Sequence, residues 1–122
     1  MSAPFACDLT VFSPEQRERL HGLVQRVFDA CLATEELPNG YRLGFAATGA
    51  DDAMKPVPLA VSIAEWITLE RLCCPSITFA MAFQDQRGPI AVRMTGHPGI
   101  KQFLLAEFKD KIADKLPRTA SP

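Results

Sequence analysis

The sequence predicts an α+β fold, a two-layer sandwich in which a mainly antiparallel sheet of three to four strands carries three helices on one face. Segments with an apolar residue at every second position, as in strands, alternate with segments whose apolar residues recur at helical spacing. Each strand-like segment has one bulky face, and each helix-like segment has an apolar stripe that needs a partner layer. A length of 122 residues fits a single domain, 1–122, with frayed ends expected at 1–4 and 117–122.

The first two elements expected are an edge strand and a long helix. Within residues 1–12, the larger apolar residues at positions 5, 7, 9 and 11 alternate with small or polar ones, which is typical of a strand. A helix is predicted to start at Ser13, whose hydroxyl can accept from the free amides of the first turn, and to run to about Thr34. Its apolar side chains form one stripe, made of Leu20, Leu23, Val24, Val27, Phe28 and Cys31. Cys31 is therefore expected in the core.

Turn residues and changes of periodicity predict the remaining elements. The expected order is a turn at 37–40, a strand at 41–47, a loop at 48–58, a helix at 59–72, a hairpin of strands at 79–83 and 90–94, and a helix from 100 to about 116. Pro75 ends the helix at 59–72, because its ring disfavours helical geometry at the residue before it and removes an amide donor.

Charge and composition exclude several classes of function. Thirteen basic and fourteen acidic residues give a net charge of −1, and the basic residues are scattered, so we expect no nucleic-acid partner. No stretch reaches the roughly 18 consecutive apolar residues of a membrane helix, so we expect no membrane partner. The first residues carry neither a basic leader nor an apolar signal run, which favours a cytoplasmic location. Phosphate loops and dinucleotide fingerprints are missing from the sequence, so no nucleotide cofactor is expected.

The strongest chemical signal is the segment Glu70-Arg71-Leu72-Cys73-Cys74-Pro75 at the end of the second predicted helix. On a helix, Glu70 shares a face with Cys73 and Cys74, because residues three and four apart are neighbours. The four cysteines of the chain could form two disulfides. In a reducing compartment, however, they are better interpreted as core residues, metal ligands or reactive thiols.

Adjacent thiols at a helix end can hold one soft cation, such as zinc, copper(I) or a heavier analogue. Because a pair is incomplete for tetrahedral zinc, Cys7 is the candidate third sulfur, and Glu70 or His97 is the candidate fourth ligand. The predicted metal site therefore consists of Cys7, Glu70, Cys73 and Cys74. It belongs to a protein that handles or senses the metal rather than one that catalyses a reaction.

Two other functions stay open. One is a cysteine-dependent enzyme in which Cys73 or Cys74 attacks an electrophile and Glu70 acts as acid or base. The position of both thiols at a helix C-terminus opposes this reading, since the helix dipole disfavours a thiolate there. The other is a non-catalytic dimeric interaction module whose cysteines only pack and whose Ala-rich sheet face meets a partner. The corresponding interpretation of Glu70 is that it pairs with Arg71 or with an arginine of the sheet.

The face of the sheet away from the helices is expected to carry small side chains and two arginines. Its members are Arg42, Gly44, Ala46, Ala80, Ala82, Ala91 and Arg93. Small residues let a second subunit approach closely, and closed homodimers are the commonest oligomers. We therefore expect this Ala-rich face to be a homodimer interface.

The chain also resembles a group of small bacterial proteins without an assigned activity. The resemblance spans residues 6–105 and rests on Ala6-Cys7-Asp8-Leu9, on the turn at 36–41, on the Glu-Arg-x-Cys-Cys-Pro motif within 69–75, and on the closing segments 95–96 and 99–104. Ser76 and His97 stand where the group is expected to have an aromatic residue and a proline. The resemblance implies a single domain of this size and directs attention to the cysteine motif, but it implies no reaction.

Overall fold

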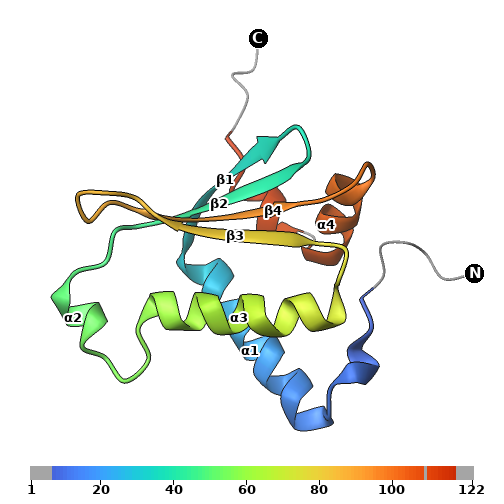
Figure 1. Ribbon diagram of the computed structural model, residues 1–122, viewed down its shortest axis with the longest axis horizontal. Helices are drawn as coiled ribbons and strands as arrows, with labels where there is room; N and C mark the ends of the chain where they lie inside the picture. The colour runs from blue at the N-terminus through green and yellow to red at the C-terminus, as the bar shows by residue number, and fades with distance from the viewer. Residues whose placement is uncertain (1–6, 109, 118–122) are drawn as a thin grey trace, which may run out of the picture.

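A four-stranded antiparallel sheet with the order β1-β2-β4-β3 forms one layer of the molecule, and the helices lie against it (Figure 1). The structure is a computed structural model, which describes residues 7–108 and 110–117. The elements are η1 (Leu9–Val11, a 3-10 helix), α1 (Pro14–Ala30), β1 (Cys31–Leu37), β2 (Gly40–Phe45), α2 (Ala50–Ala53), α3 (Leu59–Cys73), β3 (Thr78–Phe83), β4 (Ile90–Thr95), α4 (Ile100–Phe108) and α5 (Asp110–Ala113). The predicted α+β fold is confirmed. The described residues form five α-helices rather than three, because α2 and α5 are additional short helices.

The start of α1 follows the predicted capping chemistry. Ser13 Oγ accepts from the Gln16 amide at 3.2 Å, and Gln16 Oε1 accepts from the Ser13 amide at 2.8 Å, which completes a capping box. The predicted end of this helix near Thr34 is wrong. The helix stops at Ala30, and residues 31–37 form β1, which makes a hairpin with β2.

Contacts from the C-terminal part of the chain stabilise β1. Thr34 is buried, its hydroxyl donates to the carbonyl of Ile112 at 2.7 Å, and its amide donates to the carbonyl of Lys115 at 2.8 Å. A register shift between Cys31 and Ala33 leaves Leu32 as an extra residue on this strand. These long-range hydrogen bonds explain why residues 31–37, which the sequence predicts partly as a continuation of α1, form a strand instead.

The bulky face of the sheet agrees with the predicted alternation. On the central strands β2 and β4, buried side chains face each other in pairs, namely Tyr41 with Met94, Leu43 with Val92 and Phe45 with Ile90. The hairpin of β3 and β4 is also confirmed. Its turn contains Gln86 and Arg87, both with φ of 57°.

Helix α3 joins the layers of the core through Trp66, which is fully buried. Its indole ring lies 5.7 Å from the ring of Phe28 on α1, 5.5 Å from Phe79 on β3 and 6.1 Å from Phe108 on α4, measured between ring centroids. Such edge-on aromatic packing fixes the position of α3 relative to both α1 and the sheet. The last turn of α3 is therefore rigidly placed.

Three further predicted segments differ from the structure. The edge strand predicted for residues 1–12 is wrong over its described part, where η1 follows Asp8, and residues 1–6 lie outside the described residues. The expected loop at 48–58 contains α2. The helix expected from 100 to about 116 is divided into α4 and α5, with residue 109 outside the description. Among the described helices, none has the length and apolar character needed to cross a lipid bilayer.

Candidate metal centre

The last turn of α3 gathers a carboxylate and two sulfur atoms in the interior of the protein. Glu70 is 3% exposed, and Cys73 and Cys74 are also buried. Cys74 Sγ lies 3.4 Å from Glu70 Oε1 and 3.6 Å from Cys73 Sγ, and Cys73 Sγ lies 4.0 Å from the same carboxylate oxygen. Cys74 caps the helix with φ of −124°, so its side chain leaves the helical path and turns toward Cys73 and Glu70. Helical spacing and the proline stop therefore produce the predicted grouping.

The N-terminal arm supplies the third sulfur. The amide of Asp8 donates to the carbonyl of Cys73 at 2.8 Å, which holds the arm against the end of α3. Cys7 and Cys74 are joined by a disulfide. The expectation that the cysteines of the site are free thiols is therefore wrong for this pair, whereas Cys73 is free. The predicted approach of Cys7 to the adjacent cysteines is confirmed.

The structure brings together four potential metal ligands, namely Cys7, Glu70, Cys73 and Cys74. One ligand atom from each residue lies within 4.8 Å of every other, and three of the four residues are buried. A central cation bonded to two ligands at about 2.0–2.3 Å would separate them by less than twice that distance, so a cluster of this size could surround an ion once the disulfide is reduced.

Glu70 has a different partner from the expected one. Trp66 Nε1 donates to Glu70 Oε2 at 3.0 Å, and Arg71, the partner suggested by the sequence, is exposed. The pKa of Glu70 is raised to about 7, mainly by burial. The hydrogen bond from Trp66 opposes this rise, and the negative charge of Glu107 on α4 adds to it. Near neutral pH, Glu70 is therefore divided between its protonated and ionised forms.

The free thiol of Cys73 is held in its protonated form in the absence of a metal. Burial raises its pKa to about 12, and the negative charge of Glu70 adds to this effect. A bound cation reverses both contributions, because it stabilises a thiolate directly. The surroundings of Cys73 are thus not those of an activated nucleophile.

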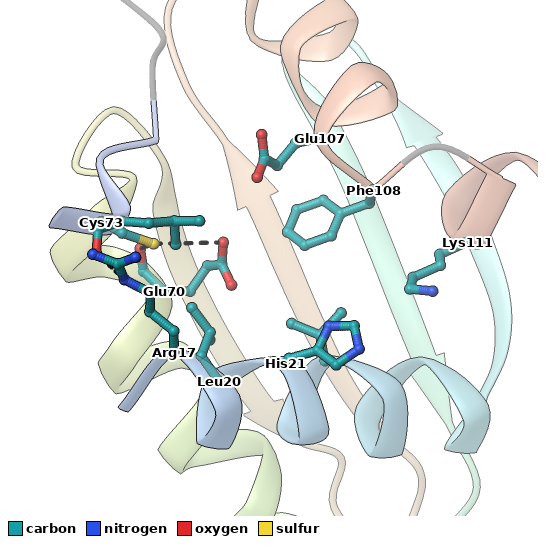
Figure 2. A pocket seen from close by; sticks show the side chains of 10 residues that line it. Arg17, Leu20, His21, Glu70, Cys73, Glu107, Phe108 and Lys111 are labelled. Atoms are coloured by element: carbon teal, nitrogen blue, oxygen red, sulfur yellow. Dashed lines mark hydrogen bonds between the residues drawn. The ribbon is translucent and has the colours of Figure 1, made fainter. Parts of the chain in front are cut away.

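A pocket of about 280 Å³ leads from the surface to Glu70 and Cys73. Figure 2 shows these two side chains on one side of the hollow, with Phe108 and Lys111 across from them and Glu107 on α4. The lining residues are Leu9, Arg17, Leu20, His21, Val24, Glu70, Cys73, Glu107, Phe108 and Lys111. No sequence motif marks this pocket, because its walls come from η1, α1, α3, α4 and α5.

The other residues considered in the sequence lie apart from the four ligands. His97 is exposed in the loop before α4 and does not belong to the group of potential ligands, whereas Glu70 does. Cys31 is buried in the core with a free thiol that donates to the carbonyl of Ala33, as its place on the apolar stripe predicts. Trp66 was missed as part of the site, although its position four residues before Glu70 signals a contact on one helix face.

Searches of protein-family models, curated proteins and solved structures found no match to this chain. The resemblance to a bacterial group therefore stays a prediction, and the chemistry of the cluster carries the functional argument.

Proposed function

We propose that the reduced protein binds one thiophilic metal ion, of the zinc, copper(I) or heavy-metal class, through Cys7, Cys73, Cys74 and Glu70. One observation supports this proposal above all others: three sulfur atoms and a carboxylate oxygen lie within 4.8 Å of one another in a largely buried position. Sulfur-rich sets of this kind select soft or borderline cations over magnesium or calcium. The role that fits such a site is metal handling or sensing.

The charges of the site agree with a divalent cation. Three thiolates around Zn²⁺ leave a single negative charge, and the carboxyl group of Glu70 can remain protonated or can coordinate as the fourth ligand. Metal binding must release the thiol protons, since the pKa of free Cys73 lies far above neutrality. We therefore expect affinity to increase with pH.

The disulfide between Cys7 and Cys74 and metal binding exclude each other. Formation of this bond removes two thiol protons and two electrons and takes two of the three sulfurs out of the ligand set. The metal-binding form must accordingly be the reduced one. A protein with these properties releases its metal when an oxidant joins Cys7 to Cys74.

Titration with zinc against a chromophoric chelator tests the proposal. The reduced wild type should bind one equivalent, and the oxidised protein and the variants Cys7→Ser, Cys73→Ser and Cys74→Ser should each bind at least about tenfold more weakly. Cys31→Ser is the matched control, because Cys31 is also a buried free cysteine but lies outside the ligand group. Equal binding by wild type and all three cluster variants would refute the proposal.

A cysteine-dependent enzyme is the weaker alternative. Burial raises the pKa of Cys73 to about 12, so this thiol lacks the low pKa of a nucleophile, and Cys74 is not a thiol while the disulfide is intact. The rate of alkylation of the reduced protein as a function of pH separates the two readings. Metal binding without activation predicts slow labelling of Cys73 below pH 9.

We also propose that the Ala-rich face pairs two copies of the chain. Ala80, Ala82 and Arg93 are exposed on this face, whereas Ala91 on the interior strand β4 is buried. Light scattering at micromolar concentration should give twice the mass of one chain, and Ala80→Glu should reduce it to the mass of a monomer. A monomeric wild type would contradict the pairing without affecting the metal site.

A further inference from the structure

The pocket beside the cysteine cluster suggests which kind of soft cation the site receives. Its floor is formed by Cys73 and Glu70, two members of the proposed ligand set. Leu20 and Val24 of α1 and Phe108 of α4 provide apolar wall surface. A cation bound to Cys73 therefore has one side toward the remaining ligands and one side toward a small, mostly apolar cavity.

A hydrated metal ion without an organic group would gain no apolar contact with these walls. Its water ligands would lie against hydrocarbon, where they lack hydrogen-bond partners, whereas an apolar group attached to the ion would remove the same surface from water. The cavity volume of about 280 Å³ is close to the lower end of small-ligand sites and is sufficient for one aromatic ring.

We propose that the site accepts a soft metal or metalloid centre that carries one small apolar organic group, with the centre on Cys73 and Cys74 and the organic group in the pocket. This inference deepens the proposed function and depends on the same sulfur ligands. The two sulfurs lie 3.6 Å apart on adjacent residues, an arrangement suited to chelation by a single atom. The third sulfur, Cys7, is dispensable for a centre that already carries one carbon ligand.

For a monosubstituted trivalent arsenical the reaction balances without electron transfer. Two arsenic–sulfur bonds form to the reduced thiols, the arsenic–oxygen bonds break, and the oxygen leaves as water with the two thiol protons. Apart from the buried Glu70, the charged side chains that line the pocket belong to the exposed residues Arg17, Glu107 and Lys111. Arg17 donates from Nε to the carbonyl of Leu9 at 3.0 Å, which holds one wall in place, and Arg17 and Lys111 are themselves exposed.

Phenylarsine oxide is the probe, and inorganic arsenite and zinc are the comparison ligands, all with protein kept reduced by a phosphine because dithiol reductants bind arsenic. Val24→Trp fills the pocket without altering a ligand, and Leu9→Trp narrows it from the exposed side, where folding is not at risk. Val61→Trp is the matched control, since Val61 is on α3, 52% exposed and outside the pocket lining.

The pocket variants should weaken binding of phenylarsine oxide by about tenfold or more and leave arsenite and zinc within about twofold of wild type. Cys73→Ser should weaken all three ligands, and Val61→Trp none. If the pocket variants affect phenylarsine oxide no more than arsenite, the inference is wrong while metal binding stands. If wild type binds phenylarsine oxide in the pocket-dependent manner but neither zinc nor arsenite, the proposed metal-ion function fails and the inference stands.

Discussion

Replacing Glu70 by Gln should remove a defined part of the pH dependence of stability. The substitution keeps an oxygen that can accept from Trp66 Nε1 and nearly preserves the volume of the side chain, so its main effect is to remove an ionisable group from a buried position. In the wild type, the pKa of Glu70 is raised from 4.5 to about 7 on folding, mainly by burial.

The sign and size of the effect follow from proton binding. Between pH 4.5 and about 7 the folded protein holds the Glu70 proton and the unfolded chain has released it, so the free energy of unfolding falls as pH rises through this window. Over the whole window the loss is about 3 kcal/mol, and the contribution is constant below and above it.

Urea unfolding of the metal-free, disulfide-bonded protein between pH 4 and 8 measures this loss, with a chelator present throughout. The difference between wild type and Glu70→Gln should change by about 3 kcal/mol across the window, since other titrating groups cancel. Trp66 is the single tryptophan of the chain, so its fluorescence should titrate near pH 7 in wild type and not in the variant.

Glu107→Gln provides the control, because the charge of Glu107 contributes to the raised pKa but its side chain is exposed. This variant should keep the fluorescence transition and move it to lower pH. A difference curve between wild type and Glu70→Gln that is flat from pH 4 to 8 would show that Glu70 is ionised at an ordinary pKa, and the account of the buried carboxyl would be wrong.

Two further predictions concern the stability of the fold. Cys7→Ser should lower the free energy of unfolding by about 4 kcal/mol relative to oxidised wild type, because the disulfide closes a loop with a sequence separation of 67 residues. In reductant, the variant and the wild type should have the same free energy of unfolding. A difference that persists in reductant would contradict this explanation. Lys115→Met should cost about 1–2 kcal/mol in urea unfolding, because Lys115 Nζ binds the carbonyls of Phe28, at 2.5 Å, and Cys31 at the end of α1. Lys111→Met, at a neighbouring exposed position, should change stability little, and equal losses in both variants would exclude the capping role.

Local chemistry made much of the fold predictable. The capping box at Ser13, the alternation in β2 and β4, and the proline after Cys74 act within a few residues, and each element they predict is present. The strand β1 was not predictable in this way. Its sequence is rich in Ala, Glu and Leu, which favour helices, and the bonds of Thr34 to Ile112 and Lys115 that keep it extended come from residues far along the chain.

The candidate site divides along the same line. Helical spacing places Glu70 with Cys73 and Cys74. The need for a third sulfur led to the prediction that Cys7 lies beside this pair, and the structure brings the four residues together. The disulfide could not be predicted, because cysteine pairing depends on the path of the arm, and the arm is fixed by the bond from Asp8 to the carbonyl of Cys73 rather than by a strand. The pocket is a product of tertiary packing and has no counterpart in any short motif.

The closed loop between Cys7 and Cys74 contains α1, the first hairpin and α3, but not β4, which occupies an interior position of the sheet. Oxidation thus closes residues 7–74 into a covalent loop, whereas the interior strand β4 belongs to the chain after this loop. Protease cleavage within the loop at 54–58 would leave two fragments connected in oxidised protein and separable after reduction. Cleavage between β3 and β4 would give two fragments with no disulfide between them in either redox state.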